Sequence, residues 1–349
     1  LRRLRRRAAH TMSREQEKLA TELGVDGLHA WGRLYNTISG KLEFPMRWPD
    51  GRVETLPISR WRALMSHADR AVGRAAFEGG NRAWATLADT CAAAINAIGG
   101  YRLTLQRHRG LDHYLDTALE QAQVERQTLE AMYRAIHEDI ALARRIFRVK
   151  ARAMKRTGIA WFEREAPLPI QAAGEQSWEE GSGQVGASFR RAYPQLADYF
   201  AMALDKRWVE SENRGGKRPG AFCTGSELTG EQRVYMTFAG ALRDASTLAH
   251  EVGHAWHGWL MRGLRPMARS YPMTLAETAS VFAEQIFAEG IARTDGISPA
   301  QQLLLLDGSL CDAAIMLLDI TVRYEFERAF HDERQQGELG VSRLQELMA

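Results

Sequence analysis

Two histidines one helical turn apart are the residues whose type and spacing most clearly predict chemistry in this 349-residue chain. His250 and His254 stand at positions i and i+4 of a helical pattern that follows a polar start signal at 244–247. On a helix this spacing puts both imidazoles on one face, where they can bind one metal ion, and tetrahedral zinc suits such ligands. Glu251 lies about 100° around the helix from His250, estimated from 3.6 residues per turn. It is therefore placed to act as general base toward a water at the metal's open position.

A catalytic zinc site also needs a third protein ligand. One class of zinc site uses a histidine six residues after the second one, but that position is Leu260. The other large class uses a glutamate from a following helix, and the first acidic residue after His254 is Glu277. A loop containing Gly263 and Pro272 separates the two segments, which allows the chain to return toward the first helix. We expect Glu277 to be the third ligand of one zinc ion per chain; the alternative is a chance motif on a surface helix.

Four further residues are candidates for the surroundings of the metal. His257 lies one turn beyond the second histidine, so it could line the cleft or simply pack. Metal-bound histidines usually need an outer carboxylate or carbonyl to fix their tautomer, and Glu284 or Asp244 could supply it. A solvated glutamate is the alternative for Glu284. Gly253 interrupts a helix, which costs about 1 kcal/mol relative to Ala, so we expect a close approach there of the Glu277 helix or of a peptide.

The surroundings of these residues resemble the oligoendopeptidase F family, which belongs to the thimet-oligopeptidase group of zinc peptidases. The resemblance is strongest from about residue 150 to 284 and is carried by the segments 233–238, 247–257, 276–284 and 216–222, and more weakly by 161–167. It implies a zinc-dependent metalloendopeptidase that hydrolyses internal bonds of short oligopeptides. It also implies a mainly α-helical fold, with thermolysin-like gluzincin active-site helices, a small β-sheet and an N-terminal helical lobe.

The resemblance further implies that the chain lacks parts at both ends. We expect residues 1–130 to form the helical lobe and 131–349 to form a zinc metallopeptidase catalytic region that is incomplete at its C-terminus. Members of the family carry a downstream His and Tyr cluster that stabilises the oxyanion, and it is not found before Ala349. The alternative function is therefore a zinc-containing peptide-binding remnant with little or no turnover. A third hypothesis is a helical interaction protein with a chance motif.

The apolar spacing of most other segments is typical of α-helices. Helical patterns cover residues 13–30, 59–98, 119–153 and 187–208. The pair Gly99-Gly100 is expected to end the second of these regions. The segment 41–58 alternates instead and contains a Pro-Asp-Gly turn, which predicts a β-hairpin. Trp256 and Trp259 are expected to point away from the metal and into the core.

Two segments before the metal helix allow more than one interpretation. The short strand predicted at 233–238 is either a sheet edge that pairs with an extended peptide or an ordinary strand of a small sheet. The glycine-dense segment 213–229 lacks a phosphate-loop pattern, so we interpret it as a mobile loop near the cleft and a candidate substrate lid.

Composition excludes several other classes of protein. A net charge of +3 is too small to indicate a nucleic-acid partner, and the basic segment 1–7 is interpreted as the solvated start of a helix. Cys91, Cys223 and Cys311 are far apart and odd in number, which implies no disulfide framework and fits a reducing cytoplasm. No apolar run reaches membrane-spanning length, and no secretory signal is visible. The expected partners are short peptides only; the sequence does not reveal the oligomeric state.

Overall fold

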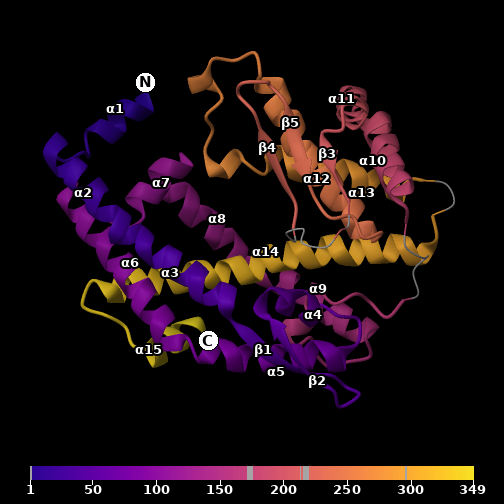
Figure 1. Cartoon of the computed structure of the whole chain (residues 1–349), viewed down its shortest axis with the longest axis horizontal. Helices are drawn as coiled ribbons and strands as arrows, with labels where there is room; N and C mark the ends of the chain where they lie inside the picture. The colour runs from indigo at the N-terminus through magenta and orange to yellow at the C-terminus, as the bar shows by residue number, and fades with distance from the viewer. Residues whose placement is uncertain (1, 171–175, 213, 215–219, 295–296) are drawn as a thin grey trace. The chain divides into compact units, whose positions relative to one another are not determined.

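The computed structural model describes all residues except 1, 171–175, 213, 215–219 and 295–296, which Figure 1 draws in grey. The mainly α-helical fold is confirmed, with two small sheets. The chain separates into two compact units, of which unit 1 comprises residues 1–120, 124–169 and 307–349, and unit 2 comprises 121–123 and 170–306. The predicted division after residue 130 falls inside a helix of unit 1 and stays a prediction. No helix of the described residues is long and apolar enough to cross a membrane.

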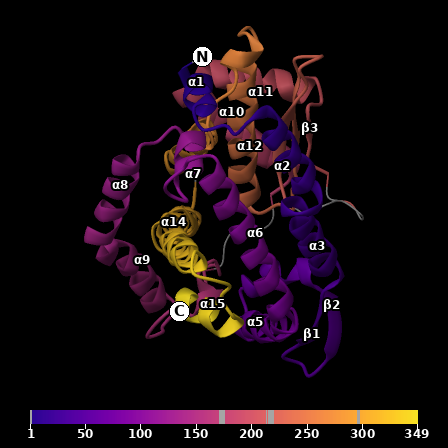
Figure 2. The same cartoon turned by 90° about the vertical axis from the view of Figure 1, so that its left-hand side faces the viewer.

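Unit 1 contains most of the helices; α2 and α3 follow one another with only Gly27 between them, and α6 lies beside α3 (Figure 2). Its helices are α1 (Arg2–Ala8), α2 (Arg14–Asp26), α3 (Leu28–Lys41), α4 (Trp61–Met65), α5 (Arg70–Ala85), α6 (Ala88–His108), α7 (Asp116–Ala122), α8 (Arg126–Glu138), α9 (Ile140–Ala153) and α15 (Val341–Met348). The long helix α14 (Pro299–Arg334) begins in unit 2 and continues into unit 1. The helical patterns predicted from apolar spacing are therefore present, although several are divided into shorter helices.

The predicted hairpin is confirmed as two antiparallel strands, β1 (Glu43–Arg47) and β2 (Val53–Pro57). Phe44 and Met46 alternate with exposed neighbours and are fully buried, as the sequence pattern requires. They pack with α5 and form the centre of the core of unit 1. The hairpin thus serves as core and carries none of the candidate site residues.

The expected helix end at Gly99-Gly100 is wrong, because α6 continues without a break to His108. Both glycines lie against the C-terminal part of α14. A Cβ on Gly99 would lie 2.8 Å from the Phe330 ring, and one on Gly100 would meet the Arg334 guanidinium. The two glycines therefore make room for another helix and do not mark a helix end.

Unit 2 holds the motif helix and a three-stranded sheet. Its helices and strands are α10 (Trp178–Ala192), α11 (Pro194–Asp205), β3 (Val209–Glu210), β4 (Phe222–Gly225), β5 (Gln232–Tyr235), α12 (Leu242–Met261) and α13 (Thr278–Ala292). Buried apolar residues of α10 to α13 and of β5 form one continuous core. Trp256 and Trp259 pack against this core beside Tyr199, as predicted.

The sheet corrects one interpretation of the strand before the motif helix. That strand exists as β5, but it lies between β3, with which it is parallel, and β4, with which it is antiparallel. Both of its sides are therefore occupied, and the interpretation as a peptide-pairing edge is wrong. The outer strands are β3 and β4, and β4 lies within the predicted loop 213–229. Residues 213 and 215–219 of that loop, and so most of the family-like segment 216–222, are outside the described residues; the lid stays a prediction.

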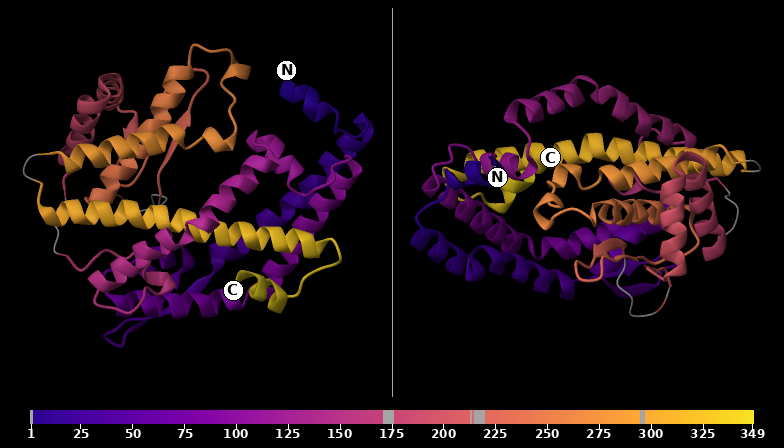
Figure 3. Two further views of the ribbon diagram at one scale, coloured as in Figure 1. Left: turned by 180° about the vertical axis from the view of Figure 1, so that it is seen from behind. Right: turned by 90° about the horizontal axis from the view of Figure 1, so that it is seen from above.

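Helices α12 and α13 pack side by side, as the views in Figures 1 and 3 show. Gly253 lies where the two helices approach closely. A Cβ there would lie 2.5 Å from the carbonyl oxygen of Ala279 and 2.7 Å from the Cα of Ser280. The expected close approach of the second helix is confirmed, and it brings the start of α13 next to the histidines of α12.

Candidate metal centre

The helix α12, which carries His250, Glu251 and His254, is capped at its start by Asp244. The Asp244 carboxylate accepts hydrogen bonds from the backbone N–H groups of Ala239 (2.8 Å) and Ala241 (3.0 Å). These contacts satisfy backbone donors near the helix start and place a negative charge where the helix dipole favours it. The structure thus places Asp244 as a capping residue. Its bonds do not include a histidine, so the candidate role as outer carboxylate falls to Glu284.

Glu277 immediately precedes α13 and is its N-cap residue. The connection from α12 contains two short 3₁₀ turns, Pro266–Ala268 and Met273–Leu275. The Arg269 side chain donates to the carbonyl oxygens of Arg262 and Leu264 and also pairs with Glu227. The Arg269 side chain therefore ties together residues 262–269, the first half of the segment that leads to Glu277.

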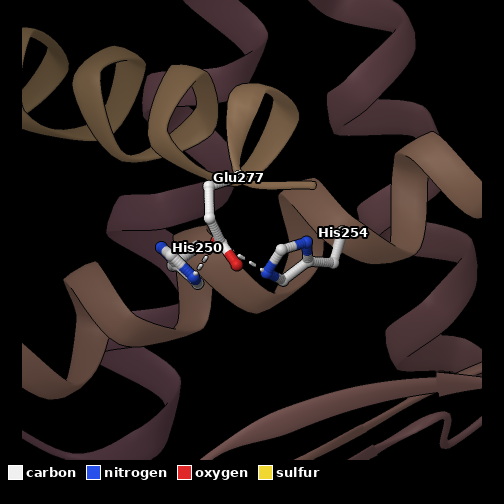
Figure 4. A group of neighbouring side chains, drawn as sticks. All are labelled: His250, His254 and Glu277. Carbon is white, nitrogen blue, oxygen red and sulfur yellow. Dashed lines mark ion pairs between the residues drawn. The ribbon is translucent and has the colours of Figure 1, made fainter. Parts of the chain in front are cut away.

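Figure 4 shows how His250, His254 and Glu277 converge. One oxygen of Glu277, Oε2, lies 3.2 Å from the Nε2 atom of each histidine. One ligand atom from each of the three residues lies within 4.8 Å of the other two. The two imidazole rings stand nearly perpendicular, with centroids 4.9 Å apart. Two imidazole nitrogens and one carboxylate oxygen are a donor set of catalytic zinc sites, so the residues present fit such an ion.

The other nitrogen of His250 contacts the carboxylate of Glu284 in α13. Its Nδ1 atom lies 3.1 Å from Glu284 Oε2, and the Ser246 hydroxyl donates to Glu284 Oε1 at 3.2 Å. With Nδ1 as donor to the carboxylate, Nε2 keeps its lone pair for a metal ion. Glu284 is thus next to the ligand set, as an outer carboxylate must be.

The pKa values of His250, Glu251 and His254 are shifted by different surroundings. Hydrogen bonding to Glu284 raises the pKa of His250, whereas burial lowers the pKa of His254. Glu251 is only 6% exposed, and burial raises the pKa of its carboxyl, with the negative charge of Glu277 as a further cause. A carboxyl with a raised pKa exchanges protons closer to neutral pH, which suits a general base.

His257 does not join the ligand group. Its ring packs against Tyr271, with the ring centroids 4.7 Å apart. Its Nδ1 atom is buried and has no hydrogen-bond partner among the described residues. The structure therefore favours the packing role for His257.

Sequence reasoning missed two residues near the site. Ser280, fully buried in α13, contacts Glu277 directly. Cys223 lies in β4, and burial together with the Glu251 charge raises its pKa to about 12. A serine three residues after a proposed ligand was a usable signal, because N-cap and N3 side chains meet at helix starts. Nothing in the sequence pattern identified Cys223.

A site of two histidines on one helix and a glutamate at the start of the next defines a class of metal-binding protein, and comparison with known proteins identifies the family. The model of peptidase family M3 matches residues 193–348, and the model named oligopeptidase F matches residues 1–44. The chain belongs to peptidase family M3, within its oligoendopeptidase F group.

Curated relatives extend this similarity along the chain. An oligoendopeptidase F homolog of Lactococcus lactis is 24% identical over 346 residues, which are 97% of this chain and 56% of the relative. Oligopeptidase PepF of Bacillus subtilis is 21% identical over 335 residues, covering 94% of this chain and 49% of the relative. The chain thus spans about half the length of the curated relatives that it matches.

Solved structures show the same fold. A Chlamydophila abortus protein superposes with a TM-score of 0.81 at 19% identity, covering 99% of this chain and 60% of the other. The crystal structure of oligoendopeptidase-F from Enterococcus faecium gives a TM-score of 0.68 at 18% identity, covering 97% and 55%. At these identities the superpositions establish the fold of this chain.

Proposed function

We propose that this chain is the metal-binding part of a zinc-dependent endopeptidase that hydrolyses internal bonds of short oligopeptides. The observation that carries the proposal is the convergence of His250, His254 and Glu277 on one point. Family membership supports a peptidase, and the relatives named oligoendopeptidases support internal cleavage of short peptides. His250, His254 and Glu277 would hold one zinc ion per chain.

A zinc ion held there would supply Lewis-acid polarisation of the peptide carbonyl and would lower the pKa of water toward neutrality. Glu251 accepts the proton of the attacking water on its carboxylate and delivers it to the nitrogen of the leaving amine. Glu284 keeps His250 in the tautomer that leaves Nε2 free as a ligand atom. Glu251 thus transfers the proton, and Glu284 orients a ligand.

We propose that an extended peptide pairs with β4. Among the described residues β4 has a strand on one side only, and it packs against α12. Its second residue is Cys223, whose pKa is raised by burial and also by the nearby Glu251 charge. Backbone hydrogen bonds to an open sheet edge hold peptides of any sequence, so this edge would bring a peptide bond close to Glu251.

The test is zinc content by elemental analysis of the wild-type chain and of Glu277→Ala. We expect about one zinc per chain in the wild type and much less in the variant, because the third ligand is lost. The exposed Glu289→Ala, on the same helix, is the matched control and should keep its zinc. Absence of zinc from the wild type would refute the proposal.

A quenched peptide then tests turnover by the zinc-loaded wild-type chain. Cleavage at an internal bond supports the peptidase. Zinc binding without cleavage would instead favour the peptide-binding protein with little or no turnover.

A further inference from the structure

A buried serine contacts the proposed glutamate ligand. Ser280 lies in the first turn of α13 and is fully buried. Its hydroxyl oxygen is 2.8 Å from Glu277 Oε2 and 2.9 Å from the Glu277 carbonyl oxygen. Glu277 Oε2 is the same atom that lies 3.2 Å from both histidine Nε2 atoms. The hydroxyl therefore touches the carboxylate at the oxygen closest to the imidazoles.

This contact restrains Glu277, whose carboxylate otherwise meets only the two histidine Nε2 atoms among the described residues. The side chain is 55% exposed. A long glutamate side chain that becomes fixed loses conformational entropy. A hydrogen bond made before the metal arrives fixes the carboxylate in advance, so that less order must be created on binding.

Ser280 is itself held in place by the packing of the two helices. A Cβ on Gly253 of α12 would lie 2.7 Å from the Ser280 Cα, so the backbones touch at this point. The serine hydroxyl has one hydrogen, and both of its acceptors belong to Glu277. Because Ser280 packs against α12 and also bonds to Glu277, the packing of the two helices determines where the serine holds the carboxylate.

We propose that Ser280 is a positioning residue that holds the Glu277 carboxylate in its metal-binding orientation. The inference rests on the proposed metal site and adds a residue that acts on the metal only through Glu277. Outer groups that orient metal ligands typically contribute about 10–100-fold to metal affinity. We expect a loss in this range when the hydroxyl is removed.

The experiment measures zinc affinity by competition with a chromogenic chelator, for the wild type and Ser280→Ala. The matched control is Ser188→Ala, which removes another buried hydroxyl of unit 2 that donates to a backbone carbonyl, that of Gln184. Ser280→Ala should bind zinc about 10–100-fold more weakly, and Ser188→Ala as tightly as the wild type. Melting temperatures of the metal-free variants check that both remain folded.

A double-mutant cycle separates positioning from a structural role. The Glu277→Ala variant keeps both histidines and should still bind zinc, although more weakly. In that background Ser280→Ala should cause no further loss of zinc affinity. An equal loss in both backgrounds would overturn the proposal. If the wild type binds zinc and Ser280→Ala binds it equally tightly, the proposal is also overturned. If the wild type binds no zinc, the proposed function fails and this inference fails with it.

Discussion

At the scale of single residues, the site separates binding from proton transfer. His250, His254 and Glu277 offer ligand atoms to one point, whereas Glu251 is buried beside them and is not part of that group. A buried carboxyl close to a ligand set, but outside it, is placed to move a proton. The two tasks can therefore be removed separately.

Glu251→Gln should retain zinc and lose turnover. The amide has nearly the same shape as the carboxyl but cannot accept the proton, and general base catalysis contributes about 10²–10⁴-fold in rate. The measurement is cleavage of a quenched peptide together with zinc content, with Glu289→Gln as control because that side chain is exposed on α13. Cleavage by Glu251→Gln at the rate of the wild type would exclude Glu251 as the base.

At the scale of elements, the approach of α12 and α13 determines whether the ligands meet. Gly253→Ala should destabilise unit 2 by about 1–3 kcal/mol, because the added methyl would overlap Ala279 and Ser280. It should also weaken zinc binding, because any shift of α13 moves Glu277. Denaturant unfolding and chelator competition measure the two effects.

Gly183→Ala in α10 is the control for this substitution. Nothing lies within 4 Å of its Cβ position, and alanine in an open helical position is favoured over glycine. Equal stability and zinc affinity of Gly253→Ala and wild type would show that the close approach does not position the ligand.

The same elements show what the sequence could and could not predict. The i, i+4 spacing places His250 and His254 locally, so it needs no knowledge of the fold. The hairpin at 43–57 was predictable because its alternation and its turn are local as well. The central position of β5 and the helix through Gly99-Gly100 depend on contacts between distant segments. Cys223 likewise became visible as a site residue only in the folded chain, whereas the spacing of Ser280 from Glu277 is local and was a usable signal.

At the scale of the whole molecule, α14 connects the two units in sequence, and buried polar contacts hold its continuation in unit 1. Lys150 of α9 donates to Asp307 Oδ2 at 3.0 Å and to Cys311 Sγ at 3.2 Å. The Lys150 side chain is only 3% exposed. Further along α14, Arg164 pairs with Asp319 at 2.9 Å. These contacts fix α14 through charges that are shielded from water.

Lys150→Ala should therefore destabilise unit 1 by about 3–5 kcal/mol, because it leaves the Asp307 carboxylate, of which only 13% is exposed, without its cation. Lys150→Met should cost less, since it fills the space of the aliphatic stem. Denaturant unfolding measures both, with Arg74→Ala as control because its pair with Glu78 lies in unit 1 and is exposed. Because Lys150 contacts none of the ligand residues, the zinc affinity of the folded variants should match that of the wild type. A loss of stability no larger than that of the control would show that the buried pair does not hold α14.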